Sequence, residues 1–297
     1  MGYLRQLYLD KYICPRSIDP VTKDNIESQL RYSIVHELGD RKLQSLTPID
    51  MQHLQKYVRK QYSGRTAQVY MVACKRMIRR AVIWNYLDKD ITLGLDPIRF
   101  VRHKPPILEP QTVLWIMHHP QVPLRDRCMI GLGGFAGLRC SEICGLQKEK
   151  INFKDRTILI DLQCRRGVIK PPKNKLPRYV PILPDLAPIL KTWYLQAPPR
   201  PWLFSNRQGQ PLNSSSYAQY CFKKILHQLE LPTIYFHALR HGFNKMLQDH
   251  GVPLRETMQI MGHQSPEMTL KTYDRASIKR IVQVIDTCFL SQEISRK

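Results

Sequence analysis

Two histidines, an arginine and a tyrosine near the carboxyl end of the chain have the types and spacing of an anion site. His237 and Arg240 are three residues apart, so on a helix their side chains lie on one face. His263 follows Gly262, and Tyr273 comes ten residues later. Arginine offers a planar fork of donors to phosphate or carboxylate oxygens, and neighbouring cations stabilise a tyrosine phenolate. The pattern predicts an anion site beside a nucleophile or proton donor.

Short helices are predicted to position these side chains. One runs from about residue 237 to 251, where Gly251 and Pro253 end it. A second spans about 254–261, and Ser265-Pro266 opens a third that carries Tyr273. His263 is therefore expected in a turn between two helices, free to point inward.

The net charge of the chain indicates a polyanionic partner. Lys and Arg number 46 against 24 Asp and Glu, a formal charge of +22 over 297 residues, and the excess is spread along the chain rather than held in a tail. Such a surplus is typical of proteins that bind nucleic acid. The length allows two domains with their own cores.

Cysteine usage and hydropathy bear on the compartment. The eight cysteines are scattered without a CxxC pair, which favours reduced thiols in the cytoplasm over a disulfide framework. The longest apolar run, residues 129–138, is about half the length needed to cross a bilayer. We therefore expect a cytoplasmic protein without a membrane partner.

Residues 1–104 are predicted to form a helical domain with a basic linker. Helices are expected at 26–38, 47–61 and 66–87. The third carries four basic residues that we assign to DNA contacts, although such a run alone fits a solvated helix face equally well: Lys75, Arg76, Arg79 and Arg80. The proline-rich stretch 97–110 reads as an extended strap, and its Arg102 and Lys104 are also predicted to contact DNA.

Residues 105–297 are predicted to be helical around one small antiparallel sheet. Strand patterns occur at 151–153, 157–162, 168–169 and 178–182, and helices at 111–119, 124–136, 185–194 and 214–229 flank them. Residues 277–290 form an amphipathic helix that either closes the core of its own domain or docks on a neighbouring copy. The fold class is mainly α with a small antiparallel β-sheet.

Four motifs in one order resemble the tyrosine recombinase family, which includes phage-type integrases and Xer-like resolvases. They are Gly137-Leu138-Arg139 with Ser141-Glu142, His237-x-x-Arg240-His241, Gly262-His263, and Tyr273. Each is weak alone, but the four in sequence, with about a hundred residues and a sheet between the first two, are specific. The resemblance covers about residues 108–280, and more loosely the helical region before them.

The resemblance implies a two-domain DNA clamp. Residues 1–104 correspond to the family's core-DNA-binding, SAM-like domain, and residues 105–297 to its catalytic domain with a C-terminal docking helix. The implied function is that of a site-specific recombinase or integrase of a phage or mobile element. Its implied partners are double-stranded DNA, further copies of itself as a tetramer in the synapse, and accessory directionality or DNA-bending factors. Nucleoid association in the cytoplasm follows.

The resemblance also assigns catalytic roles by position. Tyr273 attacks a phosphodiester to leave a covalent 3′-phosphotyrosine, while Arg139 and Arg240 hold the non-bridging oxygens. His237 and His263 donate hydrogen bonds or move the tyrosine proton. The lysine that protonates the leaving 5′-oxygen corresponds to Lys173, with Lys170 and Lys175 as alternatives. This chemistry implies no cofactor, ATP or metal.

Three other interpretations remain at the level of sequence. The first is a zinc hydrolase, because His237 and His241 have the i, i+4 spacing of zinc ligands, but the glutamate of an HExxH helix is missing. A type IB topoisomerase-like relaxing enzyme would use the same chemistry. A catalytically silent DNA-binding protein would keep only the fold.

Overall fold

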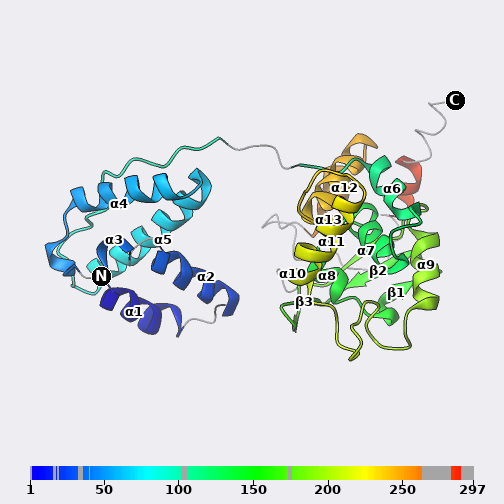
Figure 1. The fold of residues 1–297 in the computed structure, drawn as a ribbon, viewed down its shortest axis with the longest axis horizontal. Helices are drawn as coiled ribbons and strands as arrows, with labels where there is room; N and C mark the ends of the chain where they lie inside the picture. The colour runs from blue at the N-terminus through cyan, green and yellow to red at the C-terminus, as the bar shows by residue number, and fades with distance from the viewer. Residues whose placement is uncertain are drawn as a thin grey trace. The chain divides into compact units, whose positions relative to one another are not determined.

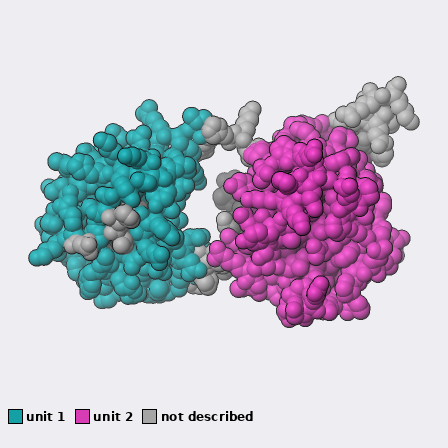
Figure 2. Space-filling view, viewed as in Figure 1, with its two compact units in different colours: residues 1–103 teal, residues 104–297 magenta. Residues whose placement is uncertain are grey.

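The chain forms two compact units, residues 1–103 and 104–297 (Figures 1 and 2). The computed structural model describes residues 2–15, 18, 20–32, 36–39, 41–101, 106–172, 176–262 and 282–288. Both units are mainly helical, and the antiparallel strands are few and short, which confirms the predicted fold class. In the described ranges, no helix has the length and apolar character needed to cross a membrane.

Unit 1, residues 1–103, is a group of helices around its own core. Its elements are α1 (Gly2–Tyr8), a π-helical turn (Leu9–Ile13), α2 (Pro20–Leu30), α3 (His36–Leu38), a 3-10 turn (Leu43–Ser45), α4 (Pro48–Gln61) and α5 (Gly64–Ile83). The long helix α5 contacts α1, α2 and α4 and buries one face, which includes Cys74, Met77 and Ile78. The helix predicted over residues 26–38 coincides with the end of α2 and with α3, and residues 33–35 between them lie outside the described ranges.

The start of α4 shows how local chemistry fixes a helix boundary. The Thr47 side chain accepts a hydrogen bond from the Asp50 backbone N–H, and the Asp50 carboxylate accepts one from the Thr47 backbone N–H at 2.8 Å. This reciprocal cap satisfies two donors that the first turn would otherwise leave unpaired. Pro48 occupies the first helical position, where a missing N–H costs nothing.

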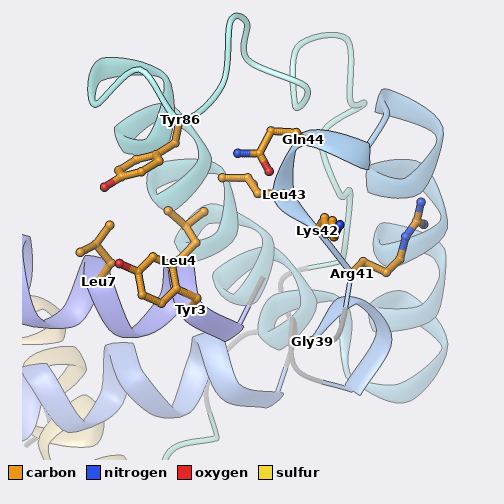
Figure 3. A pocket seen from close by; sticks show the side chains of 9 residues that line it. All are labelled: Tyr3, Leu4, Leu7, Gly39, Arg41, Lys42, Leu43, Gln44 and Tyr86. Carbon is orange, nitrogen blue, oxygen red and sulfur yellow. The ribbon is translucent and has the colours of Figure 1, made fainter.

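A hollow of about 380 Å³ lies in unit 1 (Figure 3). It is lined by residues of α1, by Gly39, by residues 41–44 and by Tyr86. Within the described ranges, the residues predicted to perform chemistry are absent from its lining. The hollow is therefore not a candidate active site.

Unit 2, residues 104–297, packs helices around a central helix and two small sheets. Its helices are α6 (Pro110–His118), α7 (Leu124–Phe135), α8 (Cys140–Cys144), α9 (Ala187–Gln196), α10 (Ser214–Ser216), α11 (Phe222–Gln228), α12 (His237–Asp249) and α13 (Leu254–Met261). A 3-10 turn (Lys148–Lys150) precedes the strands, and a π-helical turn (Tyr217–Cys221) joins α10 to α11. Helix α7 contacts α6, α8, α9 and α12, and its residues from Cys128 to Phe135 are all buried, as expected for a helix covered on every side.

The strands form two sheets rather than the single sheet predicted. Strands β1 (Ile151–Asn152), β2 (Thr157–Ile160) and β5 (Arg178–Pro181) pair antiparallel in the order β1-β2-β5. Strands β3 (Gln163–Arg165) and β4 (Val168–Lys170) form a separate hairpin. The expectation of one sheet was wrong. The sequence did not predict β3, and β4 pairs with β3 instead of joining the larger sheet. In the larger sheet, Arg178 lies opposite Ile160.

The helical segment 282–288 packs on unit 2 itself. Ile285 is buried in the core of that unit, and Asp286 forms an ion pair with Arg156, Nη2 to Oδ1 at 2.7 Å. In the single chain this segment thus closes its own domain. Docking on a neighbouring copy stays a prediction.

Candidate active site

A turn at Gly137, called here the glycine corner, positions Arg139 at the start of α8. Gly137 has φ +64°, and a Cβ on it would lie 2.4 Å from Cδ1 of Phe243. Only glycine fits this backbone and this close contact. Two residues later Arg139 precedes α8 as its N-cap, in an extended conformation. Its side chain keeps 27% of its surface exposed, so a ligand can reach it.

Glu142 holds Arg139 by two hydrogen bonds and is itself held by Arg178. The Glu142 carboxylate accepts from Nη1 of Arg139 and from the Arg139 backbone N–H, both at 2.8 Å. Nη1 and Nη2 of Arg178 donate to its two oxygens at 2.9 and 2.8 Å. Both Glu142 and Arg178 are 1% exposed. Burial acts to raise the pKa of Glu142, but the charges and hydrogen bonds of Arg178 and Arg139 outweigh it and hold that pKa at about 2.

Arg240, on the first turn of α12, is anchored by two backbone carbonyls. Its Nη1 donates to the carbonyl of Gly137 and its Nη2 to that of Met261. Arg240 is 1% exposed. Burial, followed by the charges of Arg139 and Arg178, lowers its pKa to about 9. An anion added to this group of cations would therefore be stabilised.

The two histidines of α12 lie edge to face. Their ring centroids are 4.7 Å apart with an interplanar angle of 89°. His237, the first residue of the helix, is exposed, and His241 is half-buried. Burial and the nearby Arg240 charge lower the pKa of His241, which favours its neutral form at neutral pH. His237 is one turn away from Arg240 and is open to a ligand.

Arg139, Arg178, Arg240 and Glu142 form one group, named here the arginine cluster. It joins three parts of the fold: the corner before α8, the first residue of β5 and the contact between α12 and the end of α13. The cluster contains three guanidinium groups and one carboxylate, so it carries excess positive charge. Fixed, partly desolvated donors of this kind suit a phosphoryl group on which negative charge develops.

Residues 106–280 match the phage integrase family. The chain belongs to that family. The tyrosine recombinase XerC of Syntrophus aciditrophicus is 24% identical over 306 residues, covering 93% of this chain and 94% of that protein. The resemblance to tyrosine recombinases is therefore confirmed.

Two solved structures of integrases share the fold. A Tn1549 transposon integrase in complex with a circular intermediate DNA aligns with TM-score 0.74 and 22% identity, over 94% of this chain and 99% of that chain. A lambda integrase tetramer bound to a Holliday junction aligns with TM-score 0.73 and 14% identity, over 92% and 79%. At this identity the likeness shows the fold alone.

Not every predicted catalytic residue of this integrase-family chain lies in the described ranges. Arg139, His237 and Arg240 do, and the structure ties the two arginines to one cluster with His237 one helical turn from Arg240. Lys173, His263 and Tyr273 lie outside the described residues. Their assignments stay predictions.

Gly262, the residue before the predicted His263 in sequence, ends α13 beside the arginine cluster. Gly262 ends the helix in the left-handed conformation, φ +61°. A Cβ on Gly262 would lie 2.9 Å from Cδ of Arg178. The glycine thus allows the chain to turn against the arginine cluster immediately before His263.

Three of the four basic residues of α5 assigned to DNA have partners within unit 1. The Lys75 amine donates to the Leu95 carbonyl at 3.4 Å, and Nε of Arg79 is 3.2 Å from Asp90 Oδ2. Cζ of Arg80 lies 3.8 Å from the centre of the Tyr12 ring. These contacts give the three a role in the fold of unit 1, whether or not they also bind DNA.

The remaining predicted DNA contacts differ in what the structure describes. Arg76 is exposed on α5. Arg102 and Lys104 lie outside the described residues. All six DNA-contact assignments stay predictions.

Glu142 and Arg178 received no role from sequence reasoning. Glu142 stands three residues after Arg139, the distance at which a carboxylate caps a helix start. Arg178 opens the apolar strand Arg178–Pro181, where a charge has to find a partner if the strand is buried. Both signals could be read from the sequence, but the contact between Glu142 and Arg178 depends on the tertiary fold.

Proposed function

We propose that this chain is a site-specific DNA recombinase that cleaves and rejoins strands through a covalent 3′-phosphotyrosine at Tyr273. The observation that carries the proposal is the arginine cluster. It joins Arg139 and Arg240, which are far apart in sequence, through the Gly137 carbonyl and Glu142. Membership of the phage integrase family supports the same reaction class.

The proposed chemistry gives each residue one task. The Tyr273 hydroxyl oxygen attacks phosphorus, and the bond from phosphorus to the 5′-oxygen breaks. Arg139 and Arg240 bind the non-bridging oxygens as charge accumulates on them, where each fixed donor contributes about 3–4 kcal/mol. His237 and His263 take up or relay the tyrosine proton, and Lys173 donates one to the departing 5′-oxygen. The phosphotyrosine bond conserves the free energy of the cleaved phosphodiester bond for rejoining, so neither ATP nor a metal takes part.

Double-stranded DNA is the proposed partner of both units. The charge of +22 supports binding to a polyanion. Unit 1 would bind the core site through α5 and the basic linker, and unit 2 would carry the cleavage site. The lambda integrase whose fold this chain shares is a tetramer on a Holliday junction, which supports a tetrameric synapse held by the C-terminal helix. Accessory directionality factors and a place at the nucleoid belong to the same proposal.

A suicide-substrate assay tests the proposal. Duplex DNA with a nick close to the scissile phosphate is incubated with the full chain in EDTA, so that the short released strand diffuses away and the adduct accumulates. The expected product is a denaturation-resistant adduct whose cross-linked peptide contains Tyr273. Tyr273→Phe should bind the same DNA without forming it.

Three outcomes separate the proposal from its alternatives. An adduct that survives in Tyr273→Phe contradicts the nucleophile. Relaxation of plasmids without any preferred site, together with adducts on random DNA, favours a topoisomerase-like enzyme. Salt-sensitive DNA binding with no adduct on any substrate favours a silent DNA-binding protein.

A further inference from the structure

Arg178 makes three hydrogen bonds that connect separate elements. It lies at the start of β5 and is 1% exposed. Its Nη1 and Nη2 donate to the carboxylate of Glu142 in α8, and its Nε donates to the Ile260 carbonyl in the last turn of α13 at 2.9 Å. A buried charged group is tolerated only when its donors are satisfied. Here one partner lies in α8, next to Arg139, and the other lies at the end of α13, whose next carbonyl binds Arg240.

The link from Arg178 to Arg139 passes through Glu142. Oε1 of Glu142 accepts from both Arg178 Nη1 and Arg139 Nη1. Oε2 accepts from Arg178 Nη2 and from the Arg139 backbone N–H. With four donors the carboxylate is fixed in place, and it fixes the guanidinium of Arg139 in turn. Without Arg178, the Glu142 charge would act on Arg139 alone and cancel much of its attraction for an anion.

The link from Arg178 to Arg240 passes through the end of α13. Arg178 binds the Ile260 carbonyl and Arg240 binds the next carbonyl, that of Met261. The side chain of Arg178 also lies against Gly262, which leaves no room for a Cβ there. The same guanidinium thus sets the position of the helix end that orients Arg240.

We propose that Arg178 is a positioning residue for strand cleavage, which orients Arg139 through Glu142 and Arg240 through the carboxyl end of α13. Its Nε, Nη1 and Nη2 atoms all donate to acceptors within unit 2, so it acts through the two arginines rather than on the phosphate. The inference rests on the proposed function, because it assigns Arg178 a part in that same site.

Single-turnover cleavage of the suicide substrate, with protein in excess, measures this role. The rate constant of adduct formation does not depend on the folded fraction while folded protein remains saturating. We expect Arg178→Met to lower it about 100-fold and Arg178→Lys, which keeps the charge but loses the fork, about 10-fold. The Kd for the DNA site should stay within about threefold, because many other basic residues contact the backbone.

A double-mutant cycle separates positioning from general damage to the fold. Because part of its effect passes through Arg139, Arg178→Met should cause a clearly smaller fold loss in an Arg139→Lys background than in the wild type, and the loss that remains is the part that passes through Arg240. Equal fold losses in both backgrounds would overturn the link to Arg139. The matched control is Lys150→Met, which removes a basic residue of the same unit that pairs with Asp161 at 3.0 Å outside the cluster. Its rate constant should equal that of the wild type.

Two further measurements keep the inference testable. Since Arg178→Met removes one of the two arginine partners of the buried Glu142 carboxylate, the variant Glu142→Gln/Arg178→Met removes both charges of the buried pair. It should lose cleavage as Arg178→Met does, and folded protein with a wild-type rate constant contradicts the inference. Titration of inorganic phosphate, observed on the arginine Nε–Hε NMR signals, measures anion binding at Arg139 without DNA. We expect Arg178→Met to weaken it about 10-fold.

The combined readouts distinguish the two proposals. If the wild type forms no adduct but phosphate binding at Arg139 depends on Arg178, the recombinase proposal fails while the positioning by Arg178 is upheld. If the wild type forms the Tyr273 adduct and Arg178→Met forms it at the same rate, the recombinase proposal is upheld and the role of Arg178 is rejected.

Discussion

Both oxygens of Glu142 accept hydrogen bonds from Arg178, at 2.9 and 2.8 Å, and each side chain is 1% exposed. The ion pair is therefore buried on both sides. Desolvation opposes such a pair, so its net effect on stability is modest, but removing one partner strands the other charge in the interior. The same pair orients Arg139, which couples the stability of unit 2 to the geometry of the predicted site.

The first prediction concerns acid stability. Glu142 has a pKa of about 2 in the folded protein against an ordinary value of 4.5. A lowered carboxyl pKa stabilises the fold fully above the ordinary pKa, and the contribution is lost as pH falls through the folded value. We expect Glu142→Gln to lower the free energy of unfolding by roughly 3 kcal/mol at pH 7. The difference from the wild type should shrink between about pH 4.5 and pH 2.

Urea denaturation of both proteins across this pH range measures the effect. Glu149→Gln is the control, because the Glu149 side chain is 72% exposed and its loss should leave the pH dependence unchanged. A difference between the wild type and Glu142→Gln that stays constant down to pH 2 would show that the carboxylate of Glu142 is not charged in the fold.

Helix boundaries with local signals could be read from the sequence. Thr47-Pro48 predicts the start of a helix, and α4 begins at Pro48 with Thr47 as its N-cap. Gly262 predicts the end of α13, and the structure places the helix at Leu254–Met261. In both cases the residues that decide the boundary are next to it in sequence.

Features that depend on distant residues were not predicted. Strand β3, Gln163–Arg165, has no clear alternation. Its position depends on contacts with other segments: the Gln163 backbone packs against Gly145, where a Cβ would lie 2.7 Å from it, and the Gln163 side-chain amide donates to the Pro171 carbonyl. The role of Arg178 in the arginine cluster also depends on residues that are distant in sequence. The sequence shows an arginine before an apolar strand, and only the fold brings Glu142 and Ile260 to it.

The second prediction tests the glycine corner. Gly137→Ala would force a left-handed backbone and a Cβ 2.4 Å from Phe243, so Phe243 and the Gly137 carbonyl have to shift. We expect a loss of about 2–4 kcal/mol in the free energy of unfolding, from strain and overpacking together. Because this carbonyl anchors Arg240, cleavage should fall as well.

Gly251→Ala is the matched control for that variant. Gly251 has φ +72°, but nothing lies within 4 Å of a Cβ built there. It should lose only about 1 kcal/mol from backbone strain and keep its cleavage rate. Equal losses in the two variants, measured by urea denaturation, would show that contact with Phe243 has no part in the effect.

The third prediction separates binding from chemistry at Arg240. Its two Nη atoms are held by the carbonyls of Gly137 and Met261, so a lysine cannot reproduce both contacts and the fork. Arg240→Lys should lower the single-turnover cleavage rate about 10²–10³-fold. The Kd for DNA should change by less than about threefold, because in the proposed complex the remaining basic residues supply most backbone contacts. Equal fold losses in DNA affinity and in cleavage rate would show that Arg240 contributes to general DNA binding rather than to the chemical step.

The last prediction compares two neighbouring cations of α5. Arg76 is exposed, whereas the Lys75 amine donates to the Leu95 carbonyl within unit 1. If Arg76 binds a DNA phosphate, Arg76→Ala should reduce the slope of log Kd against log salt by about 0.9 and leave the melting temperature unchanged. Lys75→Ala should lower the melting temperature by removing its contact with the Leu95 carbonyl. An unchanged salt slope in Arg76→Ala, measured by fluorescence anisotropy from 50 to 200 mM salt, would make Arg76 a solvated surface residue and move the DNA contact elsewhere on unit 1.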